Sequence, residues 1–201
     1  MWVEGRGNLP GQLVVVSGPS GSGKSSVIRR VLNEGELNLQ LSVSATSRRP
    51  RPGELEGVDY DFKSHAAFRE AIEQGEFLEW AEYNDNYYGT PAAPVLDRLE
   101  TGGSVLLEIE VAGALQIRER IPAALFVFLK TPSFRDLEDR LRARGTETEA
   151  QIFRRLKKAR IELAEAHWYD ATLVNDDFNA CVEALTKLLN TQRLGGGSSH
   201  A

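Results

Sequence analysis

Apolar runs alternate with helical patterns along the chain, and their order predicts an α/β fold. Leu13–Ser17, Val105–Ile109 and Leu125–Leu129 are short, mainly apolar runs, as buried parallel strands are. Leu41–Ser44 and Thr172–Val174 are weaker strand candidates. Helical spacing of apolar positions occupies most of the intervals between them. We therefore expect a three-layer α/β/α domain with a mostly parallel central sheet.

Polar residues before the helical patterns indicate where helices begin. Ser133 is placed to cap one helix, and Thr148 with Gln151 fits a capping box for the next. Asp176 or Asp177 is expected to cap the C-terminal helix. The second half of the chain is therefore predicted to hold three successive helices.

The interval 45–91 breaks this alternation. It contains turn signals at Pro50 and Pro52, aromatic-rich strand candidates and a short helical pattern near Ser64–Gln74. We interpret it as a small mixed α/β region that is inserted into the core and folds beside it.

Length and composition set the limits of the domain. The chain has 201 residues, of which 41% are hydrophobic and 26% charged, and this suits one sizeable α/β core with small insertions. We predict that the core comprises residues 12–44 and 92–194. The ends, residues 1–11 and 195–201, are rich in glycine and are expected to be flexible.

The charge distribution excludes some classes of partner. The formal net charge is 24 − 29 = −5, so the chain lacks the bulk positive field that recruits nucleic acid. Basic residues still cluster at Arg48–Arg51 and within Arg140–Arg160, which indicates a small anionic ligand. No apolar run is long enough to span a membrane, and the N-terminus lacks a signal-peptide pattern. We expect a cytoplasmic protein without nucleic-acid or membrane partners.

The most specific chemical signal lies at residues 18–25, which read Gly-Pro-Ser-Gly-Ser-Gly-Lys-Ser and fill every position of the phosphate-loop pattern GxxxxGK(S/T). The glycines let the loop turn its N–H groups toward a phosphate, and the helix that follows adds its positive dipole end. Lys24 supplies a cation for the outer phosphates, and the Ser25 hydroxyl is placed to ligate Mg²⁺. A plain structural turn is the alternative interpretation.

A second anion site is indicated at Arg48 and Arg51, which flank a proline. The proline stiffens the backbone between them, and two forked guanidinium groups suit a phosphate monoester because each can bind it bidentately. Tyr60 and Tyr88 are able to donate to the same phosphate. A solvated basic loop explains the arginines equally well at this point.

Eight segments are similar to those of a known family: GPSGSGKSS (18–26), SVSATSRRPRPGE (42–54), GVDYDF (57–62), EFLEWAEY (76–83), NYYGTP (86–91), LLEIE (106–110), RLRARGTETE (140–149) and VNDD (174–177). In these segments the chain resembles guanylate kinase, a nucleoside monophosphate kinase among the P-loop proteins. The resemblance runs from about Gly11 to Leu189. It implies a P-loop core, a GMP-binding insertion at residues 45–91 and a short helical lid at about residues 138–156.

The resemblance implies transfer of a phosphoryl group from ATP to GMP, which gives ADP and GDP in purine nucleotide metabolism, with Mg²⁺ accompanying the ATP. dGMP is expected to be accepted too, because no residue assigned to the site checks the 2′ position. The expected oligomeric state is a monomer or a homodimer.

The resemblance assigns ATP binding to the phosphate loop and to Asn175, for which a turn cap is the alternative role. The loop residues are Gly18, Pro19, Ser20, Gly21, Ser22, Gly23, Lys24, Ser25 and Ser26.

The catalytic residues implied by the resemblance are all cations. Arg140, Arg144 and Arg155 match arginines that close over the phosphates, and they act together with Lys24 and Arg48. Phosphoryl transfer spreads negative charge over the moving group, so fixed cations contribute more than an acid–base pair. Closure of the lid also excludes water. A solvent-facing helix with Glu–Arg pairs is the alternative for the lid arginines.

The residues that the resemblance assigns to GMP are Ser44, Arg48, Arg51, Tyr60, Glu79, Tyr88, Thr90, Glu108 and Glu110. The two arginines and two tyrosines hold the phosphate, whereas Ser44, Glu79 and Thr90 read the guanine edge. A carboxylate at Glu79 can accept from both N1–H and the 2-amino group of guanine, a pair of donors that adenine lacks. From the residues alone, Glu79 is an acid on the solvent face of a strand.

Two positions near the expected base site depart from the family pattern. Glu110 stands where aspartate is usual for guanine contact, and Ala112 replaces an expected glutamine. The extra methylene of Glu110 leaves its role in base recognition open. Glu108 ends an apolar strand, where a P-loop fold places an acid near Mg²⁺.

Two other functions stay open. Guanylate-kinase-like domains also occur as non-catalytic protein-binding modules, usually with a degraded phosphate loop, whereas this chain keeps Lys24 and Ser25. A kinase for another nucleoside monophosphate is the second alternative.

Overall fold

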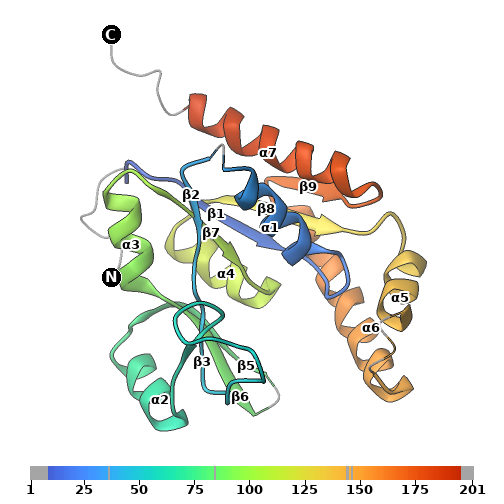
Figure 1. Cartoon of the computed structure of the whole chain (residues 1–201), viewed down its shortest axis with the longest axis horizontal. Coiled ribbons are helices and arrows are strands. Elements are labelled where there is room, and N and C mark those ends of the chain that lie inside the picture. The colour runs from blue at the N-terminus through green and yellow to red at the C-terminus, as the bar shows by residue number, and fades with distance from the viewer. Residues whose placement is uncertain (1–8, 36, 84, 144, 146, 196–201) are drawn as a thin grey trace. The chain divides into compact units, whose positions relative to one another are not determined.

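The computed structural model describes residues 9–35, 37–83, 85–143, 145 and 147–195. Its helices and strands are shown in Figure 1, and the chain divides into two compact units. The first unit comprises Met1–Val15 with Leu39–Ala124, and the second comprises Val16–Asn38 with Leu125–Ala201. The partition into core, insertion and lid suggested by the sequence stays a prediction.

In the described part of the chain, the larger sheet has the strand order β2-β7-β1-β8-β9. The strands are β2 (Leu39–Leu41), β7 (Ser104–Glu108), β1 (Leu13–Ser17), β8 (Leu125–Lys130) and β9 (Ala171–Val174). The β2–β7 and β8–β9 pairs are parallel. β1 is buried along its whole length, and β7 and β8 are buried except at their last residues, which explains their continuous apolar sequences. The expected α/β fold with a mostly parallel sheet is confirmed.

The weak strand expected at Leu41–Ser44 lies earlier, at Leu39–Leu41, so this boundary was wrong. The Ser42 N–H still donates to the carbonyl of Leu106 at 2.9 Å, but the Ser44 carbonyl accepts from the N–H of Asp61. The chain therefore leaves β7 after Ser42 and enters a second sheet, a change of partner that no local pattern indicates.

The helices of the described residues are α1 (Lys24–Glu34), α2 (His65–Glu73), α3 (Ala92–Glu100), α4 (Val111–Arg120), α5 (Phe134–Ala143), α6 (Glu149–Ala164), the short 3₁₀ helix η1 (Glu165–Trp168) and α7 (Phe178–Gly195). None of them, as far as the structure describes them, is both long and apolar enough to cross a membrane.

Three helix starts follow the capping residues predicted from sequence. The Ser133 hydroxyl accepts from the first turn of α5, and the capping box of Thr148 and Gln151 is present at α6. A carboxylate oxygen of Asp177 accepts from the third residue of α7 at 2.8 Å. Asp177, rather than Asp176, is therefore the residue whose side chain caps α7.

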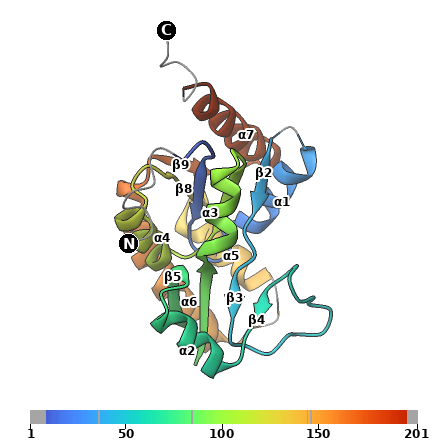
Figure 2. The ribbon, with the colours of Figure 1, turned by 90° about the vertical axis from the view of Figure 1, so that its left-hand side faces the viewer.

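The second sheet belongs to the first unit and has the order β4-β3-β6-β5. Its strands are β4 (Asp61–Phe62), β3 (Ala45–Thr46), β6 (Asn86–Pro91) and β5 (Phe77–Tyr83). β5 and β6 form an antiparallel hairpin, and β5 is an edge strand. α2 packs beside it (Figure 2), where the ring of Phe68 stacks on Phe77 at 4.4 Å between centroids.

Candidate active site

The phosphate-loop sequence forms the turn between β1 and α1, as predicted. Gly18, Gly21 and Gly23 have φ values of 142°, 96° and 92°, in the region that favours glycine. A Cβ on Gly18 would lie 2.0 Å from the carbonyl oxygen of Leu129, so no side chain fits there. The glycines of the motif are thus required by backbone geometry and by the close approach of β8.

The buried side chain of Asn175 supports the phosphate loop. Its amide nitrogen donates to the carbonyl of Ser22 at 2.8 Å, and the side chain is 5% exposed. A Cβ on Gly23 would lie 2.3 Å from the same nitrogen. In turn, the backbone carbonyl of Asn175 accepts from the guanidinium of Arg140 at 2.8 Å. The structure therefore gives Asn175 a loop-supporting position, and its contact with adenine stays a prediction.

Lys24 begins α1 and folds back along the loop. Its Nζ donates to the carbonyls of Gly18 at 2.5 Å and Pro19 at 3.2 Å. Ser25 and Ser26 follow in the exposed first turn of α1. The ammonium group and the N-terminal end of the helix thus belong to one turn of backbone, an arrangement that suits the phosphates of a nucleotide.

Two of the three predicted lid arginines lie in helices, Arg140 in α5 and Arg155 in α6. Arg155 forms an ion pair with Glu147, and Arg140 bonds to Asn175 as described above. Arg144 lies outside the described residues. Arg142, to which the sequence assigned no role, forms an ion pair with Glu138 on its own helix. For this residue the structure shows the solvent-facing Glu–Arg pairing that was the alternative to a lid.

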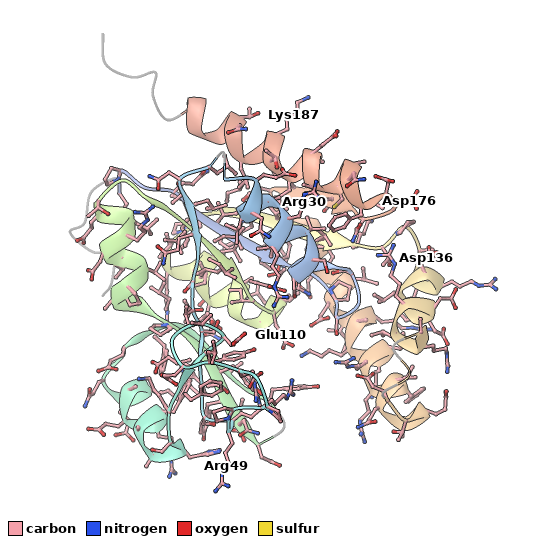
Figure 3. The ribbon with its side chains drawn as sticks, viewed as in Figure 1. Arg30, Arg49, Glu110, Asp136, Asp176 and Lys187 are labelled. Carbon is pink, nitrogen blue, oxygen red and sulfur yellow. The ribbon has the colours of Figure 1, made fainter. Side chains whose placement is uncertain are left out.

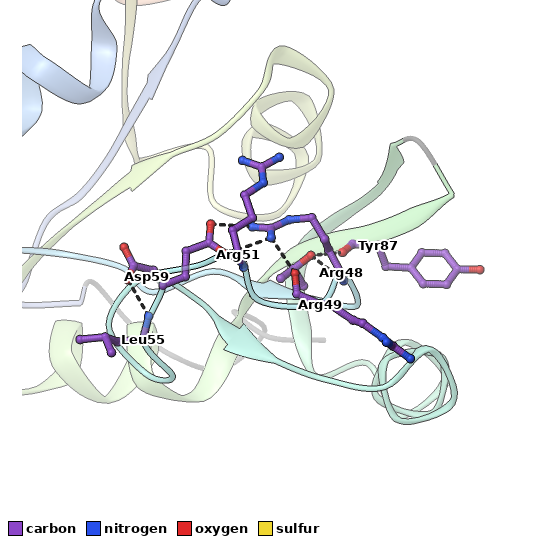
Figure 4. Close-up of polar contacts among 8 residues, drawn as sticks. Arg48, Arg49, Arg51, Leu55, Asp59 and Tyr87 are labelled. Atoms are coloured by element: carbon purple, nitrogen blue, oxygen red, sulfur yellow. Dashed lines mark hydrogen bonds and ion pairs between the residues drawn. The ribbon is translucent and has the colours of Figure 1, made fainter. Parts of the chain in front are cut away.

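Arg48 is held in place by Glu54, a residue to which the sequence reasoning gave no role. Two guanidinium nitrogens of Arg48 donate to the two carboxylate oxygens of Glu54, each at 2.9 Å (Figure 4). The same carboxylate accepts from the backbone N–H of Arg51 at 2.7 Å. This pairing raises the pKa of Arg48 and lowers that of Glu54. A glutamate three residues after Arg51 is the signal that could have indicated it.

The two arginines and two tyrosines assigned to the phosphate lie around this turn. The Arg48 guanidinium carbon is 5.4 Å from the ring centre of Tyr60, and the Tyr60 and Tyr88 rings are 6.2 Å apart. Burial raises the pKa of the Tyr60 hydroxyl, which keeps it a hydrogen-bond donor. Arg51 extends from the turn, whereas Arg49 points away from the group (Figures 3 and 4). Arg48 is therefore fixed by its partners in the turn, and the binding of a phosphate by these four residues stays a prediction.

We expect Glu54→Gln to raise the KM for GMP about tenfold, because Arg48 loses the charged partner that orients it. The KM for ATP serves as the internal control and should stay unchanged. Glu56→Gln, two residues further along the same loop, is the control variant, because it removes the same negative charge. Equal effects of the two substitutions would contradict an orienting role for Glu54.

Glu79 is buried, which contradicts the solvent-face position expected from local pattern alone. It is 5% exposed and lies opposite Thr90 in the β5–β6 register. One carboxylate oxygen accepts from the Thr90 hydroxyl at 2.6 Å. Burial raises the pKa of Glu79 to about 6, and the charge of Glu110 adds to the rise. The strand has a bulge between Phe77 and Glu79, so simple alternation fails there.

The remaining predicted base-site residues belong to the same unit. Ser44 is half-buried between β2 and β3, and Glu108 ends β7. Glu110 is exposed at the N-terminus of α4 (labelled in Figure 3). Its charge acts on Glu79, and that of Glu108 acts on Tyr60. The first unit thus contains both the acids that are predicted to contact guanine and the arginines that are predicted to contact the GMP phosphate.

Comparison with known proteins decides the family. Residues 10–192 match the family model described as guanylate kinase. The chain belongs to the guanylate kinase family. It is 52% identical over 178 residues to a guanylate kinase of Gloeobacter violaceus, a match that spans 89% of this chain and 86% of the relative. A guanylate kinase of a Nostoc species is 49% identical, with 88% of each chain covered.

A solved structure agrees with this assignment. The crystal structure of guanylate kinase from Anaplasma phagocytophilum superimposes with a TM-score of 0.74 at 31% identity, covering 91% of this chain and 86% of that chain. The resemblance stated from sequence, the α/β fold and the kinase class of enzyme are thereby confirmed. The roles of the individual residues are not decided by these matches.

The residues expected to accompany Mg²⁺ offer suitable donors. Ser25 has a hydroxyl and Glu108 a carboxylate, and oxygen ligands are those that Mg²⁺ takes. Among the described residues there is no group of three or more His, Cys, Asp or Glu side chains that could hold a metal. A hydroxyl and a carboxylate are donors of the type that Mg²⁺ takes, and the assignment of these two residues to the metal stays a prediction.

Proposed function

We propose that this guanylate kinase family member catalyses ATP + GMP ⇌ ADP + GDP and accepts dGMP as well. The observation that carries the proposal is the buried Glu79 carboxylate, bonded to Thr90 in the unit that also contains the Arg48–Arg51 turn. We place the reaction in cytoplasmic purine nucleotide metabolism and the enzyme in a monomer or homodimer.

The acceptor nucleotide is recognised at its two ends. Glu79 accepts from guanine N1–H and the 2-amino group, with Thr90 holding the carboxylate and Ser44 completing the base edge. Glu110 and Glu108 supply further acceptors nearby. Arg48, Arg51, Tyr60 and Tyr88 bind the phosphate. A buried carboxylate is costly without partners, so a base that offers two donors binds much better than one that does not.

The donor nucleotide binds at the phosphate loop. The N–H groups of residues 18–26 and the dipole of α1 surround the phosphates of ATP, and Lys24 contacts the outer ones. Ser25 and Glu108 would hold Mg²⁺, which neutralises negative charge on the phosphates when bound. Asn175 fixes the shape of the loop through its hydrogen bond to Ser22. Its predicted contact with the adenine end is part of the proposal.

Transfer then depends on position and charge. An oxygen of the GMP phosphate attacks the γ-phosphorus in line, and that oxygen is largely ionised at neutral pH, so no general base is needed. Arg140, Arg144, Arg155, Lys24 and Arg48 stabilise the negative charge that spreads during transfer. For Arg155 this requires release of its ion pair with Glu147. Closure of the lid excludes water from the γ-phosphate.

The non-catalytic binding module is disfavoured by a specific observation. The phosphate loop has the left-handed glycines, the buried Asn175 support and the folded-back Lys24 that a nucleotide site needs. A module without kinase activity has no requirement for these features.

A coupled assay of ADP release tests the proposal, with ATP as donor and GMP, AMP, CMP and UMP in parallel. The proposal predicts turnover with GMP that exceeds the other three by at least about 10²-fold in kcat/KM. Preferred turnover of another monophosphate, or none with GMP, would reject it.

Binding of GMP is expected to weaken in acid because Glu79 must be ionised to accept from guanine. With a pKa of about 6 in the free enzyme, Glu79 is mostly protonated one pH unit below this value. We expect the KM for GMP to rise about tenfold between pH 7.5 and pH 5. The phosphate of GMP also titrates near pH 6, so the profile is compared with that of Glu79→Gln. Parallel profiles in the two proteins would contradict this prediction.

A further inference from the structure

One face of α4 contacts the edge strand on which Glu79 lies. Gly113, Gln116 and Arg120 are spaced three and four residues apart, so they form one stripe along the helix. Within the residues that the structure describes, β5 has a strand partner on one side only, and its outer backbone groups need other partners. Side chains of this stripe supply them.

Gln116 pairs with the residue that follows Glu79. Its amide oxygen accepts from the N–H of Trp80 at 3.2 Å, and its amide nitrogen donates to the carbonyl of Trp80 at 2.9 Å. The side-chain amide thus replaces a strand partner at this single position. Both backbone groups of Trp80 are held against the helix.

Arg120 pairs with the residues that precede Glu79. Its Nη1 donates to the carbonyls of Phe77 at 2.9 Å and Leu78 at 2.5 Å. Two successive carbonyls face the same nitrogen because β5 has its bulge at this point. The backbone of Glu79 is therefore held on both sides by α4.

Gly113 sets the distance to the carboxylate itself. A Cβ at this position would lie 2.4 Å from Oε2 of Glu79 and 3.0 Å from its Cδ. Gly113 is buried inside a helix, where glycine is a poor helix former. The reason for glycine here is space for the Glu79 side chain, and not an unusual backbone angle.

We propose that Gly113, Gln116 and Arg120, here called the α4 clamp, are positioning residues that set the selectivity for guanine. The clamp places the Glu79 carboxylate so that it meets N1–H and the 2-amino group together, and this inference rests on the proposed function. Two hydrogen bonds to one base edge need close alignment. A small shift of β5 should therefore reduce the selectivity for guanine without unfolding the protein.

Kinetics of Gly113→Ala, Gln116→Leu and Arg120→Met test the clamp. The acceptors are GMP and inosine monophosphate, which keeps N1–H but lacks the 2-amino group. Each variant is expected to raise the KM for GMP about tenfold and to narrow the preference for GMP over inosine monophosphate to a similar extent. The KM for ATP and the kcat at saturating GMP should stay within about twofold. Glu119→Ala, at an exposed position of the same helix, is the matched control.

A double-mutant cycle separates positioning from a general effect on stability. Glu79→Asp withdraws the carboxylate by one methylene, so Gly113→Ala should have little further effect in that background. Arg120→Lys should restore part of the selectivity, because its ammonium still donates to a carbonyl of β5. If Gly113→Ala does not fold, the other two variants still test the proposal.

The outcomes are distinct. Unchanged selectivity in the folded variants, equal rises of KM for GMP and ATP, or additive effects in the cycle would overturn the clamp. Wild-type protein that does not phosphorylate GMP would instead reject the proposed function, before any variant is made.

Discussion

Lys24→Ala is expected to lower the kcat for GMP phosphorylation by about 10³-fold, since it removes a cation aimed at the charge that develops in transfer. Lys24 is the one cation in the phosphate-loop sequence, and its Nζ lies along the loop at the carbonyls of Gly18 and Pro19. The measurement is ADP release at saturating ATP and GMP.

A cation on the same helix provides the control for Lys24. Arg30 forms an exposed ion pair with Glu34, so Arg30→Ala should change kcat less than about twofold. The Kd for GMP, measured by calorimetry, should be unchanged in Lys24→Ala because the acceptor residues are untouched. Turnover close to wild type in Lys24→Ala would refute its assigned role.

Glu79→Gln is expected to raise the KM for GMP about 10²-fold and to leave the KM for ATP unchanged. Glutamine keeps the length of the side chain and an acceptor for Thr90, but it turns an NH₂ group toward a base edge that itself donates. The loss is therefore confined to the acceptor base. The two KM values are measured in the same ADP-release assay.

Glu82 offers a matched substitution on the same strand. It is exposed on β5, and Glu82→Gln should leave both KM values near those of the wild type. A similar rise of KM for ATP and GMP in Glu79→Gln would place Glu79 outside the base pocket.

Glu79→Gln is also expected to stabilise the folded protein at high pH. Burial raises the pKa of Glu79 from 4.5 to about 6, so the folded state holds the proton more tightly than the unfolded chain. Protonation of Glu79 therefore stabilises the folded state below pH 4.5. This contribution to the free energy of unfolding, about 2 kcal/mol, is lost as the pH rises through about 6. Denaturant unfolding at pH 8 and pH 4.5 measures this: Glu79→Gln should unfold at higher denaturant only at pH 8. An equal shift at both values would contradict it.

Local signals predicted much of the fold because they depend on residues close in sequence. β1, β7 and β8 are buried on both faces, so they appear as apolar runs without knowledge of their neighbours. The caps at Thr148 and Asp177 bond to residues within three positions. The bounds of the edge strand β2 were predicted wrongly, because its hydrogen bonds are to segments far along the chain.

The sequence by itself determined the phosphate-loop motif and the family, because each depends on short segments whose residues and spacing carry the chemistry. Only the tertiary structure decided that Glu79 is buried, that Glu54 orients Arg48 and that Asn175 supports the loop. It also brought Gly113, Gln116 and Arg120 to the backbone of β5. Burial and pairing of this kind depend on segments that meet only after folding, so no local pattern contains them.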